Sequence, residues 1–181
     1  MFERTITVGS AGKMLGVTGW RVGWAMGPKE IIRAIWMVHM NIPFSVATPL
    51  QEATALAIKE AQNNGFFTDC TKLYEQQRDK LMKILDETGL KPTLPHGGYF
   101  ILADTSKIPD SNEPNEKRRD FRICRKLTSE IGVTAIPPSA FYSEADQEGR
   151  SKTAGNLARF AFCKNDEQLA ATKEKLSKWR S

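Results

Sequence analysis

The chain has 181 residues, of which 40% are hydrophobic and 26% charged, so it can bury the core of one domain, or of one domain and part of another. No apolar stretch approaches the roughly 20 residues that a membrane helix needs, and the first residues do not resemble a secretory signal. The net charge of +5 comes from dispersed basic residues without interleaved aromatic side chains, which argues against nucleic-acid binding.

The cysteines and histidines form no recognisable cluster. Cys70, Cys124 and Cys163 are odd in number and lack CxxC spacing, so we expect neither a disulfide framework nor a zinc site. This usage suits a reducing compartment, the cytosol or the mitochondrial matrix. His39 and His96 have no companions at metal or catalytic-triad spacing, and we assign them no role.

The chain begins with two predicted strands and an unusual connection. Residues 4–8 are rich in β-branched side chains and residues 20–26 form an apolar alternating run, so both predict strands. Gly9 and Gly12 interrupt the pattern between them, and we expect these glycines to adopt positive φ and to let the backbone approach a ligand.

Three side chains in this region have complementary chemistry. Ser10 offers a hydroxyl and Arg21 a planar set of donors suited to phosphate, while Lys13 offers a primary amine. An amine beside a fixed cation is favoured in its neutral, nucleophilic form, which reacts with carbonyl groups. We expect Arg21, between two tryptophans of the second strand, to be buried. A carbonyl compound bearing a phosphate would fit this set.

Helical periodicity dominates the next part of the chain. A helix with Pro28 in its first turn and its end near residues 41–43 has a broad apolar face. Residues 46–61 read as a buried and tightly packed alanine-rich helix, and residues 66–88 form the longest periodic segment. A helix of that length, ending at Gly89, can connect two domains, and we place a domain boundary inside it near residue 75.

The last part mixes strands with helices. Asn165 and Gln168 resemble a capping pair at the start of the last helix, which we expect to reach Trp179. The other predicted elements are strands at 91–94, 97–103, 133–136 and 157–162, a mobile loop at 105–116, and a helix at 117–130 with its arginines on a solvated face. This order fits the end of an α/β sheet domain followed by a small α+β domain.

The Ser-x-x-Lys spacing followed eight residues later by arginine, in SAGKMLGVTGWRVGW, resembles the cofactor-lysine segment of class I aminotransferases that use pyridoxal phosphate. The similarity is greatest to the branch of kynurenine aminotransferases and cysteine-conjugate β-lyases. The other blocks that carry this resemblance are ATPLQEA at 47–53, GLKP and GGYFILAD within 89–104, AIPPSAFYS at 135–143 and ARFAFCKND at 158–166.

The resemblance implies a fold and a domain organisation. The chain would be the C-terminal half of an α/β chain of pyridoxal-phosphate-dependent transferase fold type I. Residues 1–75 would end the large cofactor-binding domain, and residues 76–181 would form the small α+β domain.

The resemblance also implies roles for individual residues. Lys13 would bind pyridoxal 5′-phosphate through a Schiff base and then carry a proton at the substrate Cα. Ser10 and Arg21 would hold the cofactor phosphate. Arg159 would bind the α-carboxylate of the amino acid or 2-oxo acid, and Phe44 would reach into the site of a neighbouring subunit in a homodimer.

Plainer interpretations exist for each residue. An isolated lysine is usually a surface lysine, Arg21 could be an ion-pair partner of Glu3 or Glu30, and Arg159 could form an ion pair at the rim of its strand. Phe44 could be an ordinary core residue. Ser10-x-x-Lys13 also matches the serine β-lactamase motif, which requires a helix beginning at the serine; we expect Gly12 and Gly16 to oppose such a helix, and no SDN or KTG motif follows.

Several parts of the family pattern have no counterpart here. These are the glycine-rich start of the cofactor domain, the aromatic that stacks on the cofactor ring, the aspartate at its pyridine nitrogen, and the asparagine and tyrosine at its ring oxygen. We therefore expect a fragment of a working aminotransferase that acts on kynurenine or on glutamine, aromatic or sulfur amino acids. The alternatives are a non-catalytic product that pairs with or regulates a full-length subunit and, less favoured, a nucleic-acid binder.

Overall fold

The computed structural model describes residues 1–110, 116–146, 148 and 152–178. The chain divides into two compact units, Met1–Asp69 (unit 1) and Cys70–Ser181 (unit 2), and each is described by itself. Both the division and the boundary expected near residue 75 fall within one long helix, α4 (Phe66–Glu87). The assignment of residues 1–75 and 76–181 to a large and a small domain stays a prediction.

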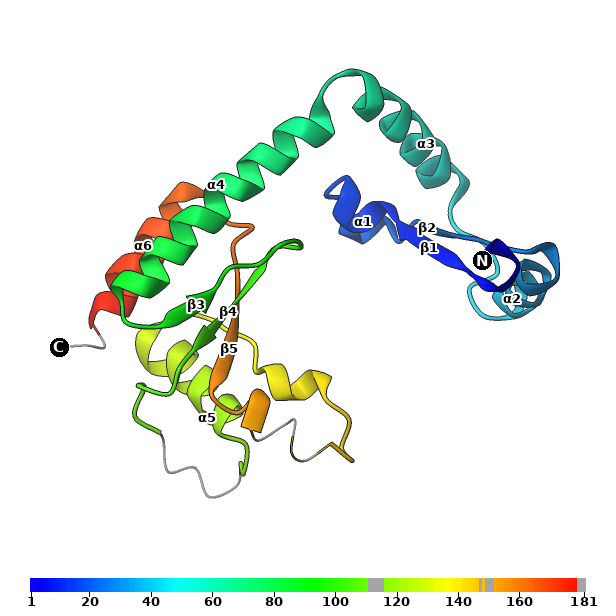
Figure 1. Cartoon of the computed structure of the whole chain (residues 1–181). Coiled ribbons are helices and arrows are strands. Elements are labelled where there is room, and N and C mark those ends of the chain that lie inside the picture. The colour runs from blue at the N-terminus through cyan, green and yellow to red at the C-terminus, as the bar shows by residue number, and fades with distance from the viewer. Residues whose placement is uncertain (111–115, 147, 149–151, 179–181) are drawn as a thin grey trace. The chain divides into compact units, whose positions relative to one another are not determined.

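Unit 1 begins with an antiparallel pair of strands, β1 (Thr7–Ser10) and β2 (Gly23–Met26) (Figure 1). The pairing register joins Thr7 to Met26 and Ser10 to Gly23. The first strand starts later than expected because the residues before it form a 3-10 turn, η1 (Phe2–Arg4). That turn is closed by a hydrogen bond from the Thr5 amide to the Phe2 carbonyl, at 3.0 Å.

The glycines of this hairpin serve strand packing. Neither Gly9 nor Gly12 has a positive φ, so that expectation is wrong. A Cβ atom at Gly9 would lie 2.4 Å from the Trp24 indole on the paired strand. The absence of a side chain at Gly9 therefore makes room for Trp24.

Two helices complete unit 1, α2 (Lys29–Asn41) and α3 (Thr48–Asn63). No residue of α2 is buried, and α3 buries only Thr54 and Ala61. The expectation that α3 is a buried helix is wrong for this chain, because alanine-rich periodicity indicates a packing face but not what covers it. Large apolar side chains stay exposed from α2 into the following loop: Ile35, Trp36, Met37, Val38, Met40, Ile42 and Phe44.

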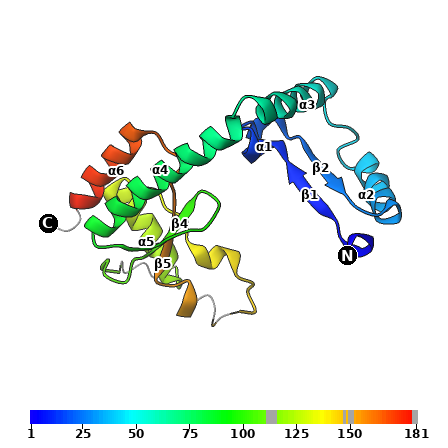
Figure 2. The ribbon, with the colours of Figure 1, turned by 45° about the horizontal axis from the view of Figure 1, so that its top comes forward.

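The long helix α4 ends as its sequence predicts. Gly89 adopts a φ of +83°, and the Leu90 amide donates to the Leu85 carbonyl at 3.0 Å, which closes the helix in a glycine cap. Figures 1 and 2 show α4 running alongside the last helix, α6 (Asp166–Lys178). Ion pairs connect the two helices: Lys80 with Asp166, and Lys173 with Glu87.

The sheet of unit 2 is antiparallel, in the order β3 (Lys91–Thr93), β4 (Phe100–Asp104), β5 (Leu157–Ala161). The strand predicted at 133–136 is reduced to a single bridge between Ile136 and Arg159. The hydrophobic core lies in this unit, and its largest fully buried apolar side chains are Leu85, Leu90, Ile101, Ile108, Ile123, Leu127 and Leu176.

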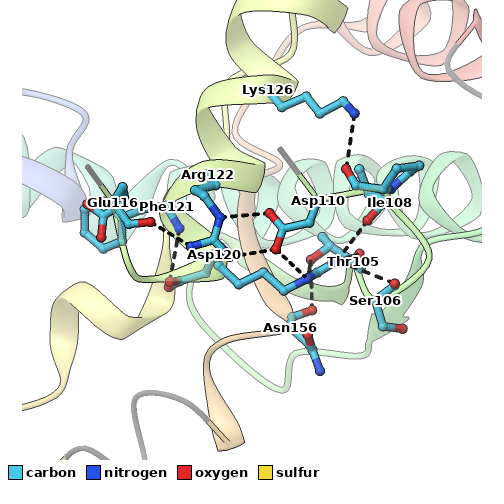
Figure 3. Close-up of polar contacts among 12 residues, drawn as sticks. Thr105, Ser106, Ile108, Asp110, Glu116, Asp120, Phe121, Arg122, Lys126 and Asn156 are labelled. Atoms are coloured by element: carbon cyan, nitrogen blue, oxygen red, sulfur yellow. Dashed lines mark hydrogen bonds and ion pairs between the residues drawn. The ribbon is translucent and has the colours of Figure 1, made fainter. Parts of the chain in front are cut away.

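Helix α5 (Arg119–Lys126) continues into a π-helical segment, η3 (Leu127–Ile131), that ends at Gly132 with a φ of +78°. Its arginines are not simply solvated. Arg119 donates to the carbonyls of Thr105 and Ile108, and Arg122 pairs with Asp110 (Figure 3). Residues 105–110 of the loop expected to be mobile at 105–116 are thus anchored to α5, whereas 111–115 lie outside the described residues.

The last helix is capped by the predicted pair. Asn165 Oδ1 accepts from the Gln168 amide at 2.8 Å, and the Asn165 amide donates to Gln168 Oε1 at 3.3 Å. Trp179 lies outside the described residues. In the part of the chain that the structure describes, no helix combines the length and apolar composition needed to cross a membrane.

Candidate functional site

Ser10 begins a short helical turn, α1 (Ala11–Met14), at the end of β1. Its extended backbone and its Oγ, which accepts from the Gly12 amide at 3.2 Å, make it the N-cap of that turn. The expectation that Gly12 and Gly16 prevent a helix here is wrong, because the serine cap satisfies an amide that would otherwise lack a partner.

Lys13 lies on this turn, three residues after Ser10, and its side chain is exposed. Arg21 lies at the same end of the hairpin, since the Ala11 amide donates to the Val22 carbonyl at 3.0 Å and Ser10 pairs with Gly23. The local fold therefore gathers the predicted serine, lysine and arginine on one end of the β1–β2 pair.

Arg21 differs from its expected setting. It follows the 3-10 turn η2 (Thr18–Trp20) in a left-handed conformation, with φ of 55°, and lies before β2. Its Nη1 donates to the Thr18 carbonyl at 3.2 Å and its side chain is exposed. The expectation of a buried arginine within a strand is wrong, because Arg21 caps η2, which ends at Trp20, and the strand pairing starts only at Gly23.

This end of unit 1 is chemically suited to a phosphorylated carbonyl compound. A hydroxyl and a guanidinium supply hydrogen-bond donors and positive charge for a phosphate. The primary amine of Lys13 is the one group of the three that can attack a carbonyl carbon. The donor set therefore fits pyridoxal phosphate.

Phe44 lies in the loop between α2 and α3. Its side chain is 82% exposed, so it is not a core residue of this chain. Its φ is +64°, in the left-handed region that bulky side chains rarely adopt, at a cost of about 1–2 kcal/mol. Strain of this kind is often found at functional positions.

Arg159, on β5 of unit 2, is held between two aromatic rings. Its guanidinium carbon lies 4.1 Å from the centre of the Phe100 ring and 4.3 Å from that of Phe141. Its Nε is buried, yet no acceptor within the described ranges takes its hydrogen. Among the residues that the structure describes, Arg159 forms no ion pair of the kind expected at the rim of a strand.

A cavity of about 460 Å³ adjoins this arginine within unit 2. Its lining includes Phe100, Ile136, Arg159 and Lys175. The Nζ of Lys175 donates to the Gly132 carbonyl at 3.1 Å. Lys164 also lines the cavity, and three cationic side chains with an aromatic wall suit an organic acid better than a neutral ligand.

The structure adds residues that the sequence reasoning did not identify. Phe100 and Phe141 lie in the blocks GGYFILAD and AIPPSAFYS, so the block pattern marks their segments but not their contact with Arg159. Asp120 is a fully buried carboxylate that accepts two hydrogen bonds from Ser139. No local signal distinguishes Asp120 from an ordinary acidic residue in the first turn of a helix.

Cys124 is not a candidate nucleophile. Burial raises the pKa of its thiol to about 12, with a smaller contribution from the Asp120 carboxylate. A thiol in this state stays protonated and unreactive at neutral pH. Within the described segments, no group of three or more histidine, cysteine or acidic side chains is arranged to hold a metal ion.

Comparison with known proteins gives a consistent result. The model of the family described as aminotransferase class I and II matches residues 2–169. The chain is 44% identical over 187 residues to kynurenine–oxoglutarate transaminase of Dictyostelium discoideum, covering 98% of this chain and 42% of the relative. It is 40% identical over 186 residues to human kynurenine–oxoglutarate transaminase 3, covering 99% of this chain and 40% of the relative.

Solved structures agree with these relatives. Bna3p of Saccharomyces cerevisiae superposes with a TM-score of 0.88 at 39% identity, covering 99% of this chain and 43% of that chain. N-succinyldiaminopimelate aminotransferase of Mycobacterium tuberculosis superposes with a TM-score of 0.85 at 33% identity, covering 99% and 43%. The chain thus spans about two fifths of the length of these proteins.

The predicted resemblance and the mixed α/β fold are confirmed by these matches. The matches also assign the Ser10-x-x-Lys13 segment to the aminotransferase family and not to the serine β-lactamases. The glycines of the segment do not make this distinction, because a helical turn forms there despite them.

Proposed function

Because the chain belongs to the family of class I and II aminotransferases, we propose that its protein transfers the amino group of kynurenine or a related amino acid to a 2-oxo acid. The names of the two kynurenine–oxoglutarate transaminases above support kynurenine as amino donor and 2-oxoglutarate as acceptor. Glutamine, other aromatic amino acids and sulfur amino acids, with β-elimination from cysteine conjugates, are the related substrates.

The setting of Arg159 is the observation that carries this proposal. Amino acids and 2-oxo acids differ at Cα but share the α-carboxylate, so one receptor serves both halves of a transamination. A guanidinium that stacks on Phe100 and Phe141, with its buried Nε lacking an acceptor among the described residues, retains donors for two carboxylate oxygens.

Lys13, Ser10 and Arg21 would hold pyridoxal 5′-phosphate. Ser10 and Arg21 would bind its phosphate, and the Lys13 amine would bind covalently to its aldehyde carbon and later hold or deliver a proton at the substrate Cα. When bound, the cofactor supplies an electron sink for the pair of electrons that deprotonation leaves on that carbon.

Covalent trapping of the cofactor tests this assignment. The purified chain is incubated with pyridoxal phosphate and reduced with borohydride, and the modified lysine is located by peptide mass spectrometry. We expect Lys13 to be the main labelled residue and Lys13→Ala to lose the label, while Lys29→Ala, which removes another exposed lysine of unit 1, keeps it. Equal labelling of Lys13 and Lys29 would contradict the assignment.

The exposed apolar surface of unit 1 supports pairing with a second subunit. It extends from α2 to Phe44, and we propose that it contacts the second copy of a homodimer, where Phe44 borders the partner's site. The same surface favours the second candidate function, a non-catalytic chain that pairs with a full-length aminotransferase subunit.

Assembly and activity measurements separate these two functions. Sedimentation of the chain alone, and mixed with a full-length transaminase, shows which complex forms. Glutamate release from kynurenine and 2-oxoglutarate then shows whether the chain transaminates. A chain that binds only to the full-length subunit and releases no glutamate would support the non-catalytic function.

We also retain a reducing compartment, the cytosol or the mitochondrial matrix, as the place where the protein acts. Cys70, Cys124 and Cys163 are free cysteines, in keeping with such a compartment. Fractionation of cells that produce a tagged protein tests this placement.

A further inference from the structure

Asp120 is the one acidic residue among the buried side chains that the structure describes. It lies in the first turn of α5 and its relative exposure is 0%. Its Oδ2 accepts from the Ser139 amide at 2.8 Å, and its Oδ1 accepts from the Ser139 hydroxyl at 2.9 Å. A buried carboxylate is costly unless it is hydrogen-bonded, so these bonds strongly favour one position of Ser139.

Ser139 belongs to a 3-10 turn, η4 (Pro138–Phe141), that also carries one of the rings over Arg159. The Phe141 side chain is 63% exposed, so burial alone does not fix the ring. Its position depends on the backbone of η4. That backbone is held by Asp120 at Ser139 and, just before the turn, by the pair of 3.0 Å hydrogen bonds between Ile136 and Arg159.

Asp120 is itself held in place, because the start of α5 is anchored. Arg119 Nη2 donates to the Thr105 carbonyl at 3.0 Å and to the Ile108 carbonyl at 2.9 Å. Arg122 makes two contacts with the Asp110 carboxylate, at 2.9 and 2.6 Å. Figure 3 shows Asp120 at the end of α5, beside the contacts between Arg122 and Asp110.

We propose that Asp120 is a positioning residue for carboxylate binding: through Ser139 it holds Phe141 over Arg159. The two rings then restrict the guanidinium to a conformation with its free donors available, so a carboxylate meets an ordered receptor. This inference rests on the proposed function, because it takes the α-carboxylate of the substrates as the ligand of Arg159.

The test uses the full chain labelled with ¹⁵N at arginine and reads the Arg159 Nε–H signal by NMR. Arg159→Lys identifies that signal by its disappearance. Ring currents from Phe100 and Phe141 shift the signal before any ligand is added, so its position reports the stacking itself. Titration with 2-oxoglutarate then gives a dissociation constant for carboxylate binding at Arg159.

In Asp120→Ala and Ser139→Ala we expect the ring-current shift to shrink and the dissociation constant to rise roughly tenfold. Asp120→Asn, which keeps an acceptor for Ser139, should recover part of both effects and serves if the alanine variant does not fold. Thr88→Val is the matched control. It removes another buried hydrogen bond of unit 2, from Thr88 Oγ1 to the Ile84 carbonyl, and should leave the shift and the affinity unchanged.

The failures of the two proposals are distinguishable. An unaltered Arg159 signal in folded Asp120→Ala or Asp120→Asn, or an equal change in Thr88→Val, would overturn the positioning role. A wild-type chain whose Arg159 signal does not respond to 2-oxoglutarate would overturn the proposed function, while the ligand-free spectra still report on the stacking.

Discussion

Glu116 and Arg118 form a local ion pair just before α5. The carboxylate accepts from the Arg118 amide at 3.0 Å, from Nε at 2.9 Å and from Nη2 at 3.0 Å. These bonds, first those of the side chain and then that of the amide, lower the pKa of Glu116 from 4.5 to about 2. Because the folded pKa lies below the unfolded one, the pair stabilises the chain fully above pH 4.5, and this stabilisation is lost as the pH falls toward 2.

We expect Glu116→Gln to remove that part of the acid dependence. Solvent screens a pair near the surface, so the difference in free energy of unfolding should be about 1 kcal/mol at neutral pH and should vanish near pH 2. Urea unfolding followed by circular dichroism at several pH values measures it. In Arg118→Ala the substitution at Glu116 should have a smaller effect, because only the bond from the backbone amide of residue 118 remains, and an undiminished effect would assign the acid dependence to another contact.

At the scale of single residues, the sequence predicts side chains whose chemistry and local spacing agree. Ser10 and Lys13 fall on one helical turn, and Arg159 falls on its predicted strand. Asp120 was missed because its partner, Ser139, is 19 residues away and the contact exists only in the folded chain. The conformation of Arg21 was missed because the 3-10 turn before it leaves no clear pattern in the sequence.

At the scale of elements, α5 and the turn at 105–110 act as one structure. Arg122 is the main connection, since its side chain is only 16% exposed and it contacts both Asp110 oxygens and the Glu116 carbonyl. Removing it leaves the Asp110 carboxylate without its closest cation. The turn should then separate from the helix more often.

We therefore expect Arg122→Ala to lower the free energy of unfolding by about 1–2 kcal/mol and to speed proteolytic cleavage near residues 105–118. Limited digestion with proteinase K, whose cleavage does not depend on the substituted lysine or arginine, followed by mass spectrometry measures the cleavage. Lys117→Ala, which removes an exposed cation next to the same helix, is the control. Similar cleavage rates in the two variants would mean that Arg122 does not anchor the turn.

Elements with local start and stop signals were predictable. The glycine at 89 ends α4 and the Asn165–Gln168 pair begins α6, as expected, because both signals act within one turn of the chain. The fate of the strand expected at 133–136 was not predictable in this way. A strand needs a partner strand, and of these residues only Ile136 pairs with β5.

At the scale of the whole chain, the two units differ in how they bury apolar surface. All members of the main hydrophobic core belong to unit 2. In unit 1, helix α2 buries nothing and α3 buries only Thr54 and Ala61. Backbone hydrogen bonds of unit 1 should therefore open more easily than those of unit 2.

Hydrogen–deuterium exchange of the isolated full chain should show this difference. We expect amides of α2 and α3 to exchange at least about tenfold faster than those of β4, β5 and the C-terminal half of α4. Addition of a full-length aminotransferase subunit should slow exchange in α2 if its apolar face is an interface. Equal protection of the two units in the chain alone would contradict the packing difference.

The family and fold were predictable from five separated blocks, because each couples a local structure to residues that the chemistry needs. The extent of burial in unit 1 was not predictable, because periodicity shows which face of a helix is apolar but not what covers that face. The chain spans about two fifths of its relatives, so the sequence alone could not show how much of α3 would remain exposed.

The protonated thiol of Cys124 has a practical consequence. It is 5% exposed, with a pKa raised to about 12, whereas Cys163 is exposed. A thiol-specific alkylating reagent should modify Cys163 at once and reach Cys124 only when α5 lifts from the sheet. The alkylation rate of Cys124 thus measures how often α5 separates from the sheet that carries Arg159, and no label has to be introduced.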